Sequence, residues 1–281
     1  TDPDFDLLAP VVNEIYTDAD DLETLSWGES AGAVTYNVLV ERTSIVDVTV
    51  INGVNLTPED DSDALTCVNR LCRYSVTNAE QDLLTDGNYR WQVTAEGGFL
   101  TPATNGPRTF VIDTVLVDLV TNGGFELSSN SIPELPKDWD AANIGGSKLT
   151  CNKISEGKYP AYQGVCSFAF KGALSYAGKL SQKVADVSGL EAGNLLILNV
   201  VISADNVQAD KAKVVATVKY ANDTKEKLEL PITAGSYAFQ LFTTSATLDD
   251  TVSKVKVSIS LSGDNGAFVV DNVRLLQDVT P

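Results

Sequence analysis

Short segments of alternating apolar and polar residues, each closed by a turn, run through this 281-residue chain. Lys254–Leu261 is a clear example, because its apolar residues Val255, Val257, Ile259 and Leu261 all fall on one face. A period of two residues is typical of a half-buried β-strand. No long segment has the 3.6-residue period of a helix, so we predict an all-β protein built of two tandem β-sandwiches.

Composition changes near residue 115. Residues 1–115 hold 20 Asp and Glu, 5 Arg and no Lys, whereas residues 116–281 hold 18 Asp and Glu, 14 Lys and 1 Arg. The first part therefore carries most of the net charge of −18. We expect two domains, residues 1–114 and 115–281. The asymmetry has two interpretations: unrelated modules joined in one chain, or a head-to-tail contact between an acidic module and a Lys-bearing one.

The chain contains no histidine. Ser-His-Asp catalysis, Cys-His catalysis and His-ligated zinc are therefore excluded, and no carboxylate pair stands out for glycoside hydrolysis. We expect no enzyme. The strongly negative charge disfavours nucleic-acid binding, and no apolar run is long enough for a membrane span. The absence of methionine and of a charged-then-apolar leader suggests a mature or excised product.

Four cysteines fall two in each part. Cys67 and Cys72 flank a four-residue tip, and Cys151 and Cys166 bracket a longer loop. Of the three pairings that four cysteines allow, pairing within each part is the simplest, and four free buried cysteines are the alternative. Neither spacing fits a CxxC zinc or redox motif. Local disulfides predict an oxidising, extracellular or cell-surface location.

In the first part, a strand bearing Trp27 is followed by Ala33–Val38 and, after the paired cysteines, by Leu84–Ala95. This order resembles a fibronectin-type-III-like domain of secreted bacterial proteins. The resemblance implies an Ig-like sandwich with Tyr89 at the tyrosine corner, its hydroxyl bonded to nearby backbone. Such domains are spacers or adhesion modules, and they bring no catalytic residues.

The second part opens with Asn122–Glu126, continues with Trp139 and Gly164–Gly172, and closes with Gly266–Leu275. This order of motifs resembles jelly-roll carbohydrate-binding modules of the family 4/9 (CenC-like) type. The resemblance implies a structural Ca²⁺ near the two ends of the module, with Glu126 and Asp271 at the matching positions. The alternative is that both acids only cap turns.

Sugar binding is the function that the same resemblance implies. Saccharide sites stack sugar rings on exposed aromatic side chains. Tyr159, Tyr162 and Tyr176 lie in or near loops and are candidates for a small platform, with packing as the alternative role. Asn55 and Asn222 each begin an N-x-S/T sequon and are candidates for glycosylation.

Leu195–Ile202 is apolar on both faces. A half-solvated strand should alternate. Either this strand is central and its second face is covered by a loop or by the other domain, or that face meets another subunit.

Two functions follow from these observations. The first is a non-catalytic extracellular structural or adhesion protein that self-associates into a surface layer or filament, as a homo-oligomer or head-to-tail polymer. The second is a carbohydrate-binding accessory protein that uses the C-terminal jelly roll to hold a polysaccharide.

Overall fold

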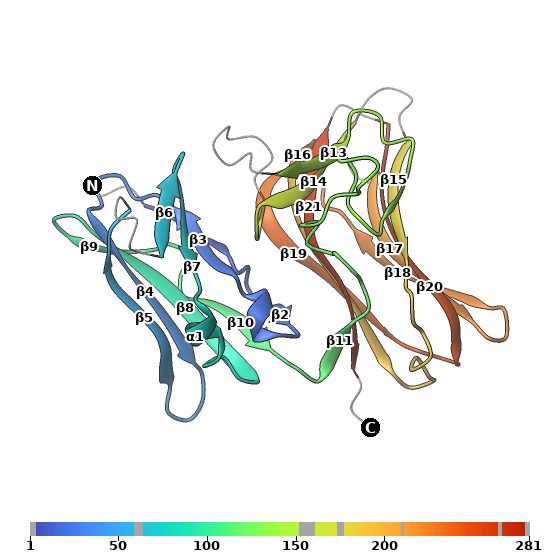
Figure 1. Ribbon diagram of the computed structural model, residues 1–281, viewed down its shortest axis with the longest axis horizontal. Helices are drawn as coiled ribbons and strands as arrows, with labels where there is room; N and C mark the ends of the chain where they lie inside the picture. Colours follow the sequence, from blue (N-terminus) through green and yellow to red (C-terminus); the bar gives the residue numbers. More distant parts are fainter. Residues whose placement is uncertain are drawn as a thin grey trace. The chain divides into compact units, whose positions relative to one another are not determined.

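The computed structural model describes residues 4–58, 64–151, 161–172, 177–208, 211–263 and 266–278. Apart from the short helices η1 (Ala19–Asp21) and α1 (Asn78–Gln81), the regular elements are all strands (Figure 1), so the predicted all-β class is confirmed. The chain divides into two compact units, the first running to Thr114 and the second beginning at Val115. Within the described residues, no helix has the length and apolar character needed to cross a bilayer.

The first unit is a sandwich of two sheets. One sheet has the order β1 (Leu7–Ala9), β3 (Thr24–Gly28), β7 (Leu71–Ser75) and β6 (Leu65–Val68). The other has the order β2 (Glu14–Tyr16), β10 (Arg108–Ile112), β8 (Gly87–Glu96), β4 (Thr35–Arg42) and β5 (Val48–Leu56), with β9 (Leu100–Pro102) paired to β8. Apolar side chains of both sheets form one core, in which Trp27, Tyr36 and Trp91 are fully buried.

Tyr89 lies in this core at the start of β8. Its hydroxyl donates a hydrogen bond of 2.5 Å to the carbonyl oxygen of Thr85. This bond back to the preceding turn is the one expected of a tyrosine corner, where the buried hydroxyl needs a local backbone acceptor.

Strand β5 runs through Asn52-Gly53, a dipeptide that is typical of hairpin turns. The two residues lie opposite Leu39 and Val38 of β4. The register then shifts before Leu56 pairs with Tyr36, and Asn55 adopts φ of 54°. The backbone flexibility of Gly53 and Asn55 therefore accommodates a β-bulge and not a tight turn.

The second unit is also a sandwich of two sheets (Figure 1). The six-stranded sheet has the order β13 (Lys148–Cys151), β14 (Cys166–Lys171), β21 (Ala267–Asp278), β16 (Leu195–Val207) and β19 (Gly235–Thr247), with β11 (Leu116–Asp118) paired to β21. The five-stranded sheet has the order β12 (Asp140–Ala142), β15 (Ala177–Lys183), β20 (Val252–Ser262), β17 (Ala212–Tyr220) and β18 (Lys225–Pro231). Their inner faces enclose a single apolar core.

Strand β16 lies inside its sheet and not at an edge, which is one of the two interpretations of its apolar residues on both faces. It pairs with β19 on one side and with β21 on the other. Leu196, Leu198 and Val200 are buried in the core, and Val201 on the opposite face is buried as well, whereas Ile197 is half-buried.

Both disulfides join neighbouring strands. Cys67–Cys72 links β6 to β7, and Cys151–Cys166 links β13 to β14. In each pair the two residues lie directly opposite each other in the ladder. The predicted pairing within each part is confirmed, and no cysteine is free.

Candidate functional site

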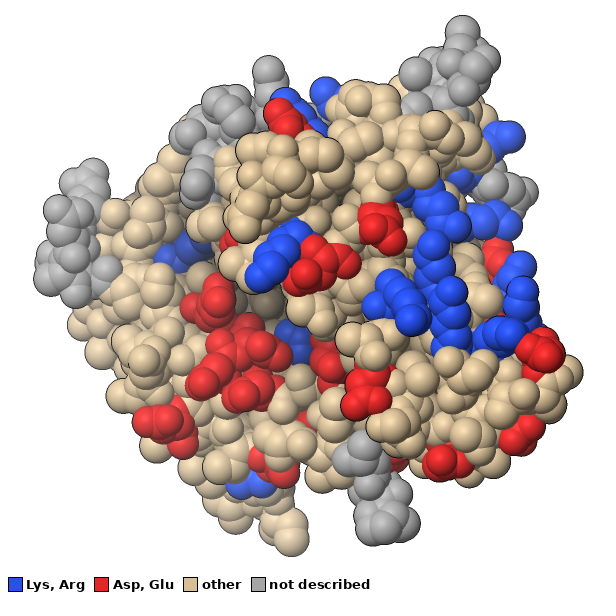
Figure 2. All heavy atoms as spheres, turned by 45° about the vertical axis from the view of Figure 1, so that its right-hand side comes forward, with Lys and Arg blue, Asp and Glu red and all other residues tan. Residues whose placement is uncertain are grey.

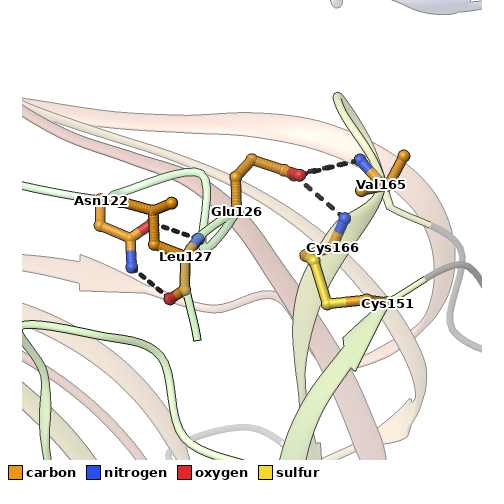
Figure 3. The surroundings of a disulfide bond; sticks show 6 residues. All are labelled: Asn122, Glu126, Leu127, Cys151, Val165 and Cys166. Atoms are coloured by element: carbon orange, nitrogen blue, oxygen red, sulfur yellow. Dashed lines mark hydrogen bonds between the residues drawn. A yellow bond between two sulfur atoms is a disulfide. The ribbon is translucent and has the colours of Figure 1, made fainter. Parts of the chain in front are cut away.

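The opening and closing motifs of the second part meet in the second unit. The Val273 N–H donates to the Gly123 carbonyl oxygen at 3.0 Å. A Cβ atom at position 123 would lie 2.0 Å from the Val273 carbonyl oxygen, so only glycine permits this approach. The Asn122 side chain fixes the loop by accepting from the Leu127 N–H at 3.0 Å and donating to its carbonyl oxygen at 2.9 Å (Figure 3).

Glu126 extends from this loop to the start of β14 (Figure 3). Its carboxylate accepts hydrogen bonds from the N–H groups of Val165 at 3.1 Å and Cys166 at 3.0 Å, beside the Cys151–Cys166 disulfide. Gly164 has φ of 57°, and a Cβ atom there would lie 2.3 Å from Oε1 of Glu126. The glycine therefore makes room for the carboxylate.

Asp271 on β21 is fully buried. Its Oδ2 atom accepts from the N–H groups of Tyr162 at 2.8 Å and Gln163 at 3.3 Å, and Oδ1 accepts from its neighbour Asn272 at 2.7 Å. Burial raises the pKa of Asp271 well above its usual value; these hydrogen bonds oppose the shift, and the charge of Glu126 adds to it. Among the described residues, no group of three or more His, Cys, Asp or Glu side chains is arranged to hold a metal ion.

The expected tyrosine platform is not supported at Tyr162. That side chain is only 2% exposed, and its ring packs against Phe239 with centroids 5.5 Å apart. Phe239 of β19 thus covers the Tyr162 ring, although the two residues are far apart in the sequence. Tyr159 and Tyr176 lie outside the described residues. Tyr237 packs on the core beside Phe242, and burial raises its pKa to about 12.

A different surface stands out on the five-stranded sheet. Its inner residues alternate with outward ones, and eight of the outward side chains are lysines, which we call the lysine face: Lys179, Lys183, Lys213, Lys219, Lys225, Lys227, Lys254 and Lys256. In Figure 2, which turns the right-hand side of Figure 1 forward, basic side chains form a band on this side of the second unit. More than half of the chain's lysines therefore lie on one sheet face.

The lysines stand opposite one another in the sheet. Lys219 on β17 pairs in register with Lys225 on β18 and with Lys254 on β20. Two residues further along β20, Lys256 lies opposite Lys183 of β15. Neighbouring strands are about 4.8 Å apart, so these ammonium groups form rows that run across the strands.

Few acids neutralise the lysine face. Nζ of Lys213 pairs with Glu229 at 2.8 Å, and Nζ of Lys219 pairs with Asp223 at 2.5 Å. The Lys219 ammonium lowers the pKa of Asp223 through this hydrogen bond and its charge. The other six lysines form no ion pair with any described residue.

Hydroxyl groups lie between the lysines. Thr217 of β17 and Ser258 and Ser260 of β20 share the outward face, and none of the outward residues of these strands is aromatic. Sequence reasoning missed this surface. Its signal was present in the alternation of Lys254-Val-Lys256-Val, but the juxtaposition depends on which strands are neighbours.

Both glycosylation candidates are exposed. Asn55 lies on β5, and Asn222 lies in the turn between β17 and β18. The Asn222 side-chain oxygen accepts hydrogen bonds from the N–H of Thr224 at 2.9 Å and from its hydroxyl at 2.5 Å. Glycosylation at either residue stays a prediction.

No family model matches the chain, and no curated protein matches it. The resemblances to fibronectin-type-III-like and CenC-like modules therefore stay predictions. Among solved structures, it is similar to the enzymatically active domain of bacteriophage CBA120 tailspike protein 4, at 14% identity and a TM-score of 0.43. That match covers 62% of this chain and 24% of the tailspike chain, so this chain spans about a quarter of that protein.

Two further similar structures are carbohydrate-binding modules. The first is a xylan-binding domain of family 22 from Paenibacillus barcinonensis, with 13% identity, a TM-score of 0.41, and coverage of 59% of this chain and 97% of that one. The second is a family 61 module in complex with β-1,4-galactotriose, with 15% identity, a TM-score of 0.39, and coverage of 57% and 97%. At such scores the likeness assigns no ligand to this chain.

Proposed function

We propose that this protein is a non-catalytic extracellular binding protein that holds a polysaccharide on the outer face of its five-stranded sheet. The observation that carries the proposal is the lysine face itself, where ammonium and hydroxyl groups share the outward side of neighbouring strands. A sugar chain presents many hydroxyl and charged groups, and such groups hydrogen-bond to both kinds of side chain. Strands are a rigid support for a site of this kind.

Two further features support the proposal. Both disulfides suit an oxidising compartment, where extracellular polysaccharides are found. The composition of the lysine face also differs from that of a protein–protein interface, whose core is depleted in Lys and Ser and enriched in aromatic side chains.

The test is a retention screen of the intact protein on a panel of immobilised neutral and acidic polysaccharides. We expect retention on at least one of them, and release by the soluble form of the same polysaccharide. Passage through every matrix without delay would reject the proposal.

Self-association is the second candidate function, and the uneven charge of the two parts favours it, since residues 1–115 contain 20 acidic residues and no Lys. Contacts between the acidic part of one copy and the lysine face of the next would join head to tail. Sedimentation velocity at low salt tests it, because a protein that stays monomeric at high concentration does not polymerise.

We also propose that Glu126 and Asp271 hold a structural Ca²⁺. Both side chains are carboxylates, the ligand type that Ca²⁺ prefers, and the negative charge of Glu126 acts on the buried Asp271. A bound cation would offset that repulsion, with backbone carbonyl oxygens completing its shell. We expect a chelator to lower the melting temperature of the wild-type protein and to leave that of Asp271→Asn unchanged; an unchanged wild-type midpoint would contradict calcium binding.

A further inference from the structure

We propose that the ligand of the lysine face is a linear polyanion, a polysaccharide that carries carboxylate or sulfate groups, lying across the strands. This inference rests on the proposed function and specifies the chemical class of its ligand. It follows from the register of the lysines, from the small number of neutralising acids, and from the lack of aromatic side chains among the outward residues of β17, β18 and β20.

The strand register places lysines directly opposite one another. Like charges directly opposite each other in an antiparallel sheet destabilise it. The lysine face contains three such pairs, Lys219 with Lys225, Lys219 with Lys254, and Lys183 with Lys256. The sheet would be more stable with neutral residues at these positions. A bound polyanion would convert the repulsion into attraction.

The positive charges of the lysine face are arranged in rows across the strands. Lys225, Lys219 and Lys254 form one row across β18, β17 and β20. Lys227 and Lys256, two residues further along their strands, belong to a second row that continues to Lys183 on β15. The rows are about 6.7 Å apart, and lysines on adjacent strands are about 4.8 Å apart. In the second row Thr217 separates Lys227 from Lys256. A chain with an anionic group on successive sugar units can contact such rows repeatedly.

The positive charge of the lysine face comes from Lys and not from Arg. Lys is a compact point charge on a flexible stem, which suits a repeated anionic charge better than one fixed geometry. The only Arg of residues 116–281, Arg274, is buried on β21 in the other sheet. A neutral sugar chain would need aromatic platforms, and the outward residues of β17, β18 and β20 include none.

Two other occupants fit less well. A second copy of the chain would bring acidic residues, but a Lys- and Ser-rich face lacks the aromatic anchors that protein interfaces use. A nucleic acid carries the right charge, but the net charge of −18 opposes its approach. Both are outcomes of the experiment below.

The experiment measures binding of the intact protein to polygalacturonate and dextran sulfate, with methyl-esterified polygalacturonate and dextran as their uncharged counterparts. Lys254→Gln/Lys256→Gln removes two charges from the lysine face. Lys137→Gln/Lys148→Gln removes two charges from exposed positions elsewhere in the same unit and is the matched control. Circular dichroism melts establish that each variant folds.

We expect at least one of the two polyanions to bind, with an affinity that falls as NaCl is raised from 50 to 500 mM. The face variant should bind roughly thirtyfold more weakly, and the control variant should bind as the wild type does. Preference for polygalacturonate or for dextran sulfate distinguishes a carboxylated from a sulfated ligand, and either preference supports the proposal.

Several results would overturn it. Equal or tighter binding of the uncharged counterparts would reject the polyanion while leaving polysaccharide binding intact. Equal weakening by both double variants would place the site elsewhere, and tighter binding of duplex DNA would replace the ligand class. Self-association that only the face variant abolishes, without binding to any glycan, would favour a second copy and would reject the proposed function as well.

Discussion

Lys219 and Lys254 lie directly opposite each other on β17 and β20, two strands at the middle of the five-stranded sheet. Lys219 pairs with Asp223 in the adjoining turn, whereas Lys254 has no ion-pair partner among the described residues. The two positive charges therefore face each other on an open surface. This relationship gives the lysine face a measurable cost in stability.

We expect Lys254→Gln to raise the free energy of unfolding by a few tenths of a kcal/mol at low ionic strength, because it removes a like charge directly opposite Lys219. The gain should disappear in 1 M NaCl, where charges are screened beyond about 3 Å. Urea denaturation at both salt concentrations measures it. Lys148→Gln, whose cross-strand neighbour is Ala169, should show no gain; equal gains in the two variants would contradict the pairwise origin.

Tyr237→Phe should stabilise the protein by about 1 kcal/mol. The Tyr237 hydroxyl is buried and has no hydrogen-bond partner among the described residues, so removing it removes a desolvation cost. Tyr89→Phe is the matched comparison, because its hydroxyl bonds to the Thr85 carbonyl oxygen, and its loss should cost about 1 kcal/mol. Changes of the same sign in thermal melts of the two variants would refute this explanation.

Alkaline pH gives a separate test of Tyr237. Burial raises its pKa from 10.0 to about 12, so the folded state keeps the proton at a pH where the unfolded state releases it. Below pH 10 both states keep the proton, so the shift has no effect on stability. As pH rises from 10 to 12, the wild-type protein loses stability because the unfolded state releases the proton first. We therefore expect the advantage of Tyr237→Phe over the wild type to widen across this range. A constant difference would mean that the hydroxyl is solvated.

The two disulfides should differ in what they contribute. Chain-entropy arithmetic gives about 2 kcal/mol for Cys67–Cys72, which closes a short loop, and about 3 kcal/mol for Cys151–Cys166. Paired Cys→Ser variants, compared by urea denaturation, measure both. Replacing Cys151 and Cys166 should cost more, and the reverse order would show that strand pairing around the shorter loop depends on its disulfide.

Local sequence signals predicted the features that depend on neighbouring residues. Alternation identified the strands and their buried faces, as in Lys254–Leu261, and short spacing identified both disulfides. The Tyr89 hydrogen bond, which joins residues four positions apart, was implied by the resemblance to a fibronectin-type-III-like domain.

Features that depend on residues far apart in the sequence were not predicted or were predicted wrongly. Alternation predicts that Lys219 and Lys254 point outward, but only the strand order places them opposite each other. Tyr162 was a candidate for the tyrosine platform, but its ring is buried against Phe239, which is far away in the sequence. Asn52-Gly53 has a strong turn preference, yet pairing with β4 keeps both residues in a strand.

Acetylation footprinting of the intact protein, read by mass spectrometry, determines whether the lysine face holds the ligand. Each lysine is labelled with and without a saturating polysaccharide that the retention screen identifies. If the lysine face holds the polysaccharide, Lys219, Lys227, Lys254 and Lys256 are labelled more slowly in the complex. Labelling of Lys137 and Lys148 is then unchanged. Protection of Lys137 and Lys148, or binding without protection of any lysine, would show that the ligand is not held by the lysine face.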